Sequence, residues 1–562
     1  MNAENERPTG GKLVLVTIGI ALAMFLAALD QTIVGTALPR IVADLRGLEL
    51  YAWVLTAYLV TSTTMTPIAG KLGDLFGRKP LLIFGMVGFV LASALCGQAG
   101  DMNALIASRA VQGLFGGILF STVFASIADL YAPARRARIQ GVFGGIFGIA
   151  SVIGPVVGGF LTDNLNWRWI FYVNVPVGAI AIAFVLLTMP SVRATVRKTW
   201  RDIDLAGAAL LAAGLVPMLI GFSITRDHDW TSPEVLGLLG FSVLALVAFV
   251  VIESRVREPI VPLELFRNRT FAVACIVGFL VTVGFFGAIV YVPLVYQGIL
   301  GLPATNSGLL LTPMMVGIIT GSVVSGQLMV RLRRYRYVGT VGITLLILGL
   351  WLLSRVRPGA AELQVVTALV IVGLGTGLTF PLYLNSVQSA VEPRYLGVVT
   401  SQVQFWRNVG GTIGTAVLGS VLSHRLPERV TTEVAALRLP AELGVSVPQG
   451  GSAQALFDPA AIAAARAALP PQALAAFESV LAAVRGALAM TLEEIFLFGA
   501  VAVAIAIPVS LFLDDVPISR EHPMPAEQQV AAPAELAPQR PLVMPAEQQV
   551  AAPADWARND RP

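Results

Sequence analysis

Charged residues, cysteine and histidine are all scarce in this chain of 562 residues. Only 13% of the residues are charged, and there are two cysteines and three histidines. So low a charged share lies well below that of a soluble globular protein. Both cysteines, Cys96 and Cys275, fall inside apolar stretches, where a thiol is usually a small packing residue. We therefore expect no disulfide and no metal centre.

Motifs that carry enzyme chemistry are also missing. The chain has no Gly-x-x-x-x-Gly-Lys-Ser/Thr loop for ATP phosphates and no carboxylate pair with catalytic spacing. Its lysines and arginines are spread through loops instead of being clustered with aromatic residues, and the net charge is only +4. These absences argue against ATP hydrolysis and against nucleic acid as a partner. We therefore expect no enzyme activity and no cofactor.

The chain does have many long apolar runs. Hydrophobic residues make up 56% of it and the mean hydropathy is +0.77. A helix needs about 20 apolar residues to span a bilayer, and the first run is too long for a signal peptide. We therefore predict an all-α polytopic membrane protein with fourteen spans, at residues 13–38, 51–69, 80–99, 103–128, 139–162, 168–189, 203–223, 234–253, 271–297, 306–330, 337–354, 362–387, 397–423 and 489–513.

Positive charge is shared unevenly among the short links between these spans. Lysine and arginine are frequent in the links that follow even-numbered spans, such as Arg135 and Arg138 after the fourth, and sparse in most of the others. Cytoplasmic loops carry the excess of lysine and arginine in membrane proteins. We therefore expect the links after even-numbered spans, and both termini, to be cytoplasmic.

The link between the second and third spans is densely charged. It reads GKLGDLFGRK over residues 70–79, and so short a polar link predicts a tight turn. The pattern resembles the loop between spans 2 and 3 of the major facilitator superfamily. The resemblance implies a secondary transporter in which a charge network latches the two halves together, formed by Gly70, Gly73, Asp74, Gly77, Arg78 and Lys79 with Asp129 and Arg136. The alternative is an ordinary solvated loop.

Two opposite charges lie at similar depth in the first and fourth spans. Asp30 is about eight residues from the outer end of its span and Arg109 about six, which at ~1.5 Å per residue gives depths of ~12 and ~9 Å. Ionisable groups at such depth are functional candidates, although a static ion pair is the alternative. The surrounding sequences, LDQTIVGTALP and RAVQG, resemble motifs of the fourteen-span drug:proton antiporters. That resemblance implies that Asp30 and Arg109 serve in proton coupling.

The fifth span is rich in glycine. Glycines four apart allow close helix packing, which is the interpretation we give to pairs elsewhere such as Gly317/Gly321 and Gly373/Gly377. In this span, however, the pattern also resembles the antiporter motif that marks exporters within the superfamily. Its residues here are Gly145, Gly154, Pro155, Gly158 and Gly159.

Arg407 lies about ten residues from the inner end of its span, at ~15 Å and thus near the midplane. Such a charge must find a carboxylate, carbonyl groups or water. We expect a role in packing or gating, with substrate contact as the alternative. A polar path near it would be lined by Asn385, Gln388, Gln402 and Gln404. Gln31 of the first span is a further candidate for a central cavity.

The resemblance covers residues 13–423 and 489–513. It implies two six-helix bundles with two inserted spans, divided into a cytoplasmic start 1–12, a first bundle 13–189, extra spans 190–270, and a second bundle 271–513 with an external link 424–488. The tail 514–562 repeats MPAEQQVAAPA and should be disordered.

The function that we predict is proton-driven export of amphipathic drugs or toxic compounds by a monomer in the bacterial inner membrane. Its partners would be the small-molecule substrate, protons and the lipid bilayer. Export of a lipid or a metabolite is an alternative on the same fold. A membrane sensor that has lost transport is an alternative of another class.

Overall fold

The computed structural model describes most of the chain as helix. The proline-rich tail and the middle of the predicted external link lie outside the described residues. Those residues are 10–45, 50, 53–190, 204–225, 228–256, 258–300, 311–332, 334–437, 462, 466–467 and 470–515.

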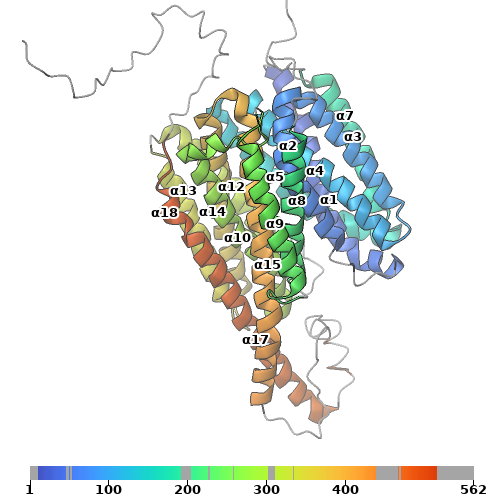
Figure 1. Ribbon diagram of the computed structural model, residues 1–562. Helices are drawn as coiled ribbons and strands as arrows, with labels where there is room; N and C mark the ends of the chain where they lie inside the picture. Colours follow the sequence, from blue (N-terminus) through green and yellow to red (C-terminus); the bar gives the residue numbers. More distant parts are fainter. Residues whose placement is uncertain are drawn as a thin grey trace, which may run out of the picture. The chain divides into compact units, whose positions relative to one another are not determined.

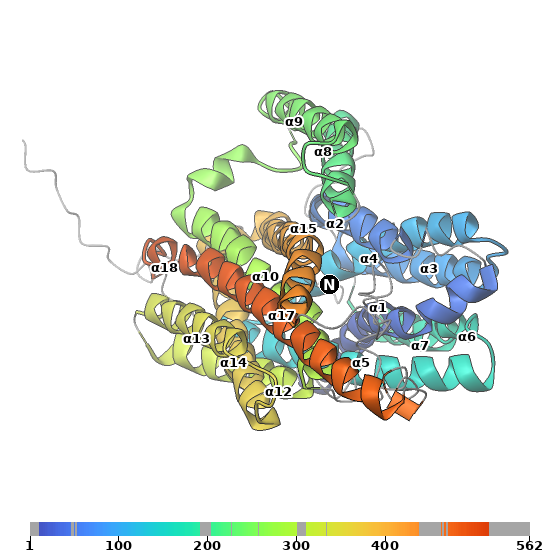
Figure 2. The same cartoon turned by 90° about the horizontal axis from the view of Figure 1, so that it is seen from below.

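The first six predicted spans coincide with helices that lie together on one side of the molecule (Figures 1 and 2). The short α6 runs almost directly into α7, so the two make up the sixth span. These N-terminal helices are α1 (Gly10–Leu45), α2 (Trp53–Phe76), α3 (Arg78–Gly97), α4 (Met102–Leu130), α5 (Pro133–Asn164), α6 (Trp169–Tyr172) and α7 (Asn174–Thr188). We call α1–α7 the N-terminal half.

The next two helices, α8 (Leu205–Ile224) and α9 (Pro233–Glu253), pack against each other. Figure 2 shows this pair at the edge of the other helices. Of the two, α8 makes contact with α2 and α15, so the inserted pair touches both the N-terminal helices and the later ones.

The remaining spans form the C-terminal half, α10–α18. In it a π-helical turn, η4, extends α10, and α18 follows α17 almost without a break. The helices are α10 (Arg269–Leu294), η4 (Val295–Ile299), α12 (Thr312–Arg331), α13 (Arg336–Ser354), α14 (Glu362–Ala390), α15 (Leu396–Ala436), α17 (Pro471–Ala504) and α18 (Ala506–Ser510), with 3-10 turns η3 (Leu263–Arg267) and η6 (Pro393–Tyr395). A described helix thus lies at each predicted span, and the all-helical prediction is confirmed.

Eleven helices within the described residues are long and apolar enough to cross a membrane. Three further helices, α2, α5 and α15, match predicted spans but are not among these eleven. Their contacts give the reason, because α15 packs on α2 and α5 packs on α12, so these helices join the two halves. A helix face that meets protein can carry polar groups that a lipid-facing one cannot.

The link after the second span differs from the predicted ten-residue turn. Residues 70–76 continue α2 as helix, and α3 begins at Arg78, so only Gly77 separates the two helices. Its φ of +91° lies in a region that side chains strongly disfavour, which is why glycine is required there.

The predicted outer link is helical at its two ends, and the apolar spacing over residues 472–489 indicates a helix there. Instead of stopping at 423, α15 continues to Ala436, and α17 already begins at Pro471. Figure 1 shows both helices extending beyond the others. Val430 and Val434 of α15 pack against Val480 and Val484 of α17, so the two extensions bury apolar side chains against each other.

Glycine allows α12 and α14 to lie very close together. A Cβ atom at Gly373 would stand 2.1 Å from the Met314 carbonyl oxygen, and one at Gly317 would stand 2.5 Å from the Val370 carbonyl oxygen. Both obstacles are backbone atoms, which cannot turn aside as a flexible side chain can. The predicted packing role of these glycines is therefore what the structure shows.

We expect Gly373→Ala to lower the free energy of unfolding by about 1–3 kcal/mol, as overpacking of a close helix contact does. Thermal denaturation of the purified protein in detergent measures the loss. The control is Gly240→Ala in α9, where an added Cβ meets no atom within 4 Å. Equal stability of the two variants would contradict the close α12–α14 packing.

Candidate functional site

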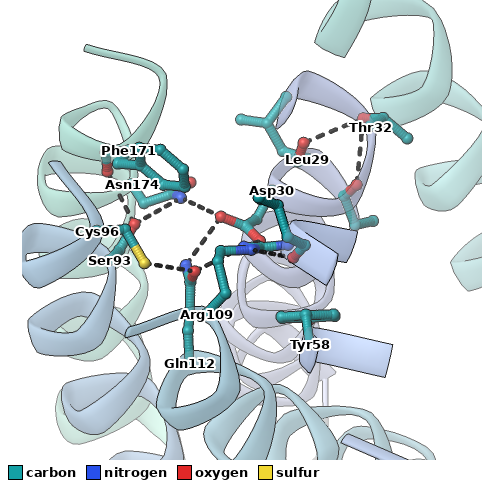
Figure 3. A network of polar contacts seen from close by, with 12 residues as sticks. Leu29, Asp30, Thr32, Tyr58, Ser93, Cys96, Arg109, Gln112, Phe171 and Asn174 are labelled. Atoms are coloured by element: carbon teal, nitrogen blue, oxygen red, sulfur yellow. Dashed lines mark hydrogen bonds and ion pairs between the residues drawn. The ribbon is translucent and has the colours of Figure 1, made fainter. Parts of the chain in front are cut away.

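A fully buried carboxylate, that of Asp30, lies at the centre of a polar network in the N-terminal half (Figure 3). Asp30 Oδ2 accepts a hydrogen bond of 2.6 Å from Arg109 Nη1. Its Oδ1 accepts hydrogen bonds from Gln112 Nε2 at 2.8 Å and from Asn174 Nδ2 at 2.9 Å. Three donors from α4 and α7 therefore converge on one carboxylate of α1.

The partner of this carboxylate, Arg109, is itself fully buried and held on several sides. Nη1 also donates to Gln112 Oε1 at 2.6 Å, and Nε donates to the Val54 carbonyl at 3.4 Å. The guanidinium carbon stands 4.4 Å from the centre of the Tyr58 ring, within cation–π range. A buried ion pair is stable only when further hydrogen bonds support both charges. These contacts supply them at Nε and Nη1, whereas the buried Nη2 has no hydrogen-bond partner.

A second layer of side chains fixes the donors. Asn174 Nδ2 also donates to Ser93 Oγ at 3.0 Å, and Ser93 Oγ donates to the Phe171 carbonyl at 2.9 Å. Cys96 Sγ lies 3.5 Å from Gln112 Oε1 and so touches the network. Because these residues come from α3, α4, α6 and α7, the network joins most of the N-terminal half around Asp30.

Sequence reasoning found Asp30 and Arg109 but missed the neutral members of the network. Gln112 had a usable signal, because it stands three residues after Arg109 and so shares its helix face. Asn174 is a polar residue next to a long apolar run, which also could have marked it. For Ser93 and Tyr58 we find no such signal, since both are common packing residues in membrane helices.

The charged segment 70–79, at the end of α2 and the start of α3, contacts the C-terminal half. Asp74 accepts hydrogen bonds from the backbone N–H of Gly397 at 3.0 Å and of Val398 at 2.8 Å, in the first turn of α15. A helix N-terminus favours a carboxylate, since its N–H groups are unsatisfied and its dipole is positive there. Arg78 donates to Asp74 and, at 2.8 Å, to Asp129 of α4.

Glycine makes this contact possible. A Cβ at Gly70 would lie 2.0 Å from Ser401 Oγ and 2.8 Å from the Gly397 carbonyl oxygen, so α2 and α15 touch through backbone. A Cβ at Gly73 would lie 2.5 Å from Arg78 Nη1. Next to this contact, Lys79 Nζ donates to the Met189 carbonyl at 2.6 Å, beyond the end of α7.

Arg136, Asn385 and Gln388 form a further contact between the halves at the same end. Asn385 Nδ2 donates to the Pro133 carbonyl at 2.9 Å, and Gln140 Nε2 donates to Gln388 Oε1 at 3.2 Å. Arg136 donates to the Gln388 carbonyl at 3.4 Å through Nη1. Asn385 and Gln388 therefore bind the start of α5.

Of the other residues predicted for the central cavity, Gln404 accepts a hydrogen bond from Arg407 Nη1 at 2.8 Å. Gln31 is half-buried next to Asp30 on α1. Asn385 and Gln388 thus contact α5, Gln404 contacts Arg407, and Gln31 follows Asp30 on α1.

The glycines of α5 meet two different helices. A Cβ at Gly154 would lie 2.2 Å from Thr32 Oγ1 of α1, and one at Gly145 would lie 3.2 Å from Ile319 of α12. Gly159 has no atom within 4 Å of the Cβ position, and the Gly158 carbonyl accepts a hydrogen bond from Thr162. Pro155 is contained within α5. Within the motif, Gly154 thus sets how closely α5 approaches α1, two residues from Asp30.

At the opposite end, Asp44 of α1 holds the start of the sixth span. Its carboxylate accepts hydrogen bonds from Trp167 Nε1 at 2.9 Å and from Arg168 Nη1 at 3.1 Å. These two hydrogen bonds lower the pKa of Asp44. The contact lies within the N-terminal half, whereas the contacts of Asp74 and Asn385 join the halves.

Comparison with known proteins agrees with this architecture. The profile of the Major Facilitator Superfamily matches residues 20–415. The chain is 38% identical over 534 residues to the "Multidrug transporter protein MdtP" of Bacillus subtilis, covering 93% of this chain and 96% of that one. It is 32% identical over 501 residues to "Multidrug resistance protein 3" of the same organism, covering 89% and 94%.

A solved structure shows the same fold. The human organic anion transporter MFSD10 aligns with a TM-score of 0.56 and 17% identity, over 88% of this chain and all of that one. At this identity the likeness concerns the fold alone. The chain belongs to the Major Facilitator Superfamily, and the prediction of a multi-pass membrane transporter, and not an enzyme, is confirmed.

We expect Gly70→Ala to separate the halves where α2 meets α15, because the added methyl group meets the Ser401 side chain and the Gly397 carbonyl oxygen of α15. Spin labels placed at the exposed positions Arg135 and Arg394 report the separation by their mutual distance. The distance should increase in Gly70→Ala and stay at the wild-type value in Gly486→Ala, where the added Cβ has free space. An unchanged distance in both variants would argue against a role of Gly70 in closure.

Proposed function

We propose that this protein is a proton-coupled exporter of amphipathic drugs or other toxic compounds. The observation that carries the proposal is the buried Asp30 carboxylate with Arg109 at 2.6 Å, in a chain whose relatives are named multidrug transporters. A carboxylate that deep in a membrane transporter is expensive to keep, and it can exchange a proton when access to it changes. Arg109 would tune how readily that exchange occurs.

In the proposed cycle, the deprotonated carboxylate favours the inward-facing state that loads substrate. Protonation from outside then resets the transporter. Two structural features support alternation between two states: the contacts of Asp74 and Asn385 close one end, and they consist of hydrogen bonds that can open. The sequence around Gly154 resembles the antiporter motif of exporters, which supports export as the direction of transport. At Gly154, α5 also lies close to α1 near Asp30.

We propose further that the end closed by Asp74 is cytoplasmic, that both termini are cytoplasmic, and that the protein acts as a monomer in a bacterial inner membrane. The distribution of lysine and arginine supports this orientation. A reporter enzyme that works only in the cytoplasm should be active when it is fused after Arg520. Activity of a reporter that works only outside the cytoplasm, fused at the same position, would place the C-terminus outside and contradict the proposed orientation.

The central prediction is that Asp30→Asn abolishes pH-driven export while the protein stays inserted and folded. Asparagine keeps the shape of the side chain but carries no titrating proton. Transport is measured in proteoliposomes under an imposed pH gradient, and the yield of folded protein by size-exclusion chromatography. Wild-type rates in the Asp30→Asn variant would refute the proposed coupling, and absent proton flux in the wild type would favour a sensor.

The charge of the substrate sets how transport should respond to voltage. A proton that crosses the membrane potential gains ~2.3 kcal/mol per 100 mV, which at ~1.4 kcal/mol per factor of ten sustains roughly a fortyfold gradient of a neutral compound. Exchange of one proton for one monovalent cation moves no net charge. With Asp30 as the sole carrier, export of such a cation should therefore follow the pH gradient alone, whereas export of a neutral compound should also respond to voltage.

A further inference from the structure

Arg407 of α15 is a buried cation whose charge has no acidic partner among the described residues. Its side chain is only 8% exposed. Nη1 donates to the Gln404 amide oxygen at 2.8 Å and Nη2 donates to the Phe380 carbonyl at 2.6 Å, while Nε has no hydrogen-bond partner. The guanidinium carbon stands 4.2 Å from the centre of the Phe380 ring. All these contacts are with neutral groups.

The other deeply placed arginines with described ion pairs show what Arg407 lacks. Arg109 faces Asp30, and Arg78 faces both Asp74 and Asp129. Neutral acceptors satisfy individual N–H groups, but a desolvated charge remains costly unless an opposite charge is near. A buried arginine with a free N–H and no carboxylate is therefore suited to receive an anion.

The position of Arg407 points to the substrate path. It lies against α10 and α14, since Gly278 of α10 leaves room for its side chain and Phe380 belongs to α14. The halves of such transporters are related by a pseudo-two-fold axis along the membrane normal, with substrate bound between them. Under that relation, α10 and α14 correspond to α1 and α4, which carry Asp30 and Arg109.

The surroundings of Arg407 also suit the apolar part of a ligand. Phe380 makes an edge-to-face contact with Phe285, with ring centres 5.7 Å apart, and Phe285 makes a second one with Phe286 at 5.8 Å. An aromatic cluster therefore adjoins the unpaired cation. Ligand sites typically combine an apolar wall with a few polar groups that fix orientation.

We infer that Arg407 binds the acidic group of amphipathic substrates that carry a carboxylate, sulfonate or phosphate, with the body of the substrate against the phenylalanine cluster. This inference rests on the proposed export function and names a substrate class for it. In the N-terminal half, Asp30 neutralises Arg109. In the C-terminal half, the acidic group of the substrate would supply the opposite charge that Arg407 lacks among the described residues.

Equilibrium binding to the full chain in lipid nanodiscs tests the inference with two probes on one steroid scaffold: cholate, which is anionic, and cholamide, its uncharged amide. The wild type should bind cholate more tightly than cholamide. Arg407→Gln should weaken cholate binding about ten- to hundredfold, the range for loss of a hydrogen-bonded charge, and should change cholamide binding less than about threefold. Arg407→Lys, which keeps the charge, should retain most of the preference for cholate.

The surface variant Arg394→Gln serves as a control, because Arg394 is exposed and should leave both affinities unchanged. If Arg407→Gln only misfolded part of the protein, the number of binding sites would fall equally for cholate and cholamide. The ratio of the two affinities, measured on the folded fraction, would then stay at the wild-type value. Equal weakening of both probes, or a wild type that does not prefer cholate, overturns the inference.

Failure of the inference can be told apart from failure of the proposed function. If Asp30→Asn abolishes pH-driven export while Arg407→Gln keeps the cholate preference, coupling stands and the anion site falls. If Arg407→Gln removes the preference while Asp30→Asn still exports at wild-type rates, the anion site stands and the coupling residue is wrong.

Discussion

The burial of Asp30 against Arg109 is the interaction on which the N-terminal half depends. Taking two charges out of water costs several kcal/mol for each ion, and their attraction offsets this only with good geometry and further hydrogen bonds. Here Gln112 and Asn174 supply donors to the carboxylate, and Val54 and Tyr58 hold the guanidinium. Since these groups come from several helices, a shift of any one of them would leave a buried charge without its partners.

The least apolar helices are also the ones through which the halves touch. Asp74 and Gly70 of α2 contact the start of α15, and residues at the start of α5 contact Asn385 of α14. These contacts consist of backbone, amide and carboxylate groups. Apolar side chains meet between the halves as well, since Ile68 of α2 packs against the cluster that includes Phe405 and Val409 of α15. Polar and apolar contacts thus both hold the halves together.

Two of the buried arginines, Arg109 in the N-terminal half and Arg407 in the C-terminal half, have different partners. Arg109 is neutralised within the protein, whereas Arg407 has only a carbonyl, an amide and an aromatic ring. In the proposed mechanism the proton binds at Asp30, next to Arg109, and the acidic group of the substrate binds at Arg407. Proton and substrate would then not compete for the same residue.

The sequence by itself determined the helices and the ionisable residues worth attention. Apolar runs of bilayer length placed every span, because a membrane helix must be apolar along most of its length, and Asp30, Arg109 and Arg407 were evident because charge is rare there. Gly70 and Asp74 were evident from their motif. The tertiary structure alone decided which of these residues meet. It brings Asp30 into contact with Arg109, and it places Asn385 and Gln388 in hydrogen bonds with α5. It also leaves Arg407 with neutral partners and no carboxylate among the described residues. It also extended α2 and α15 beyond the predicted spans. Hydropathy is a local property that shows whether a segment can lie in lipid. Which helices pack together depends on contacts between residues far apart in the chain, and hydropathy does not reveal those contacts.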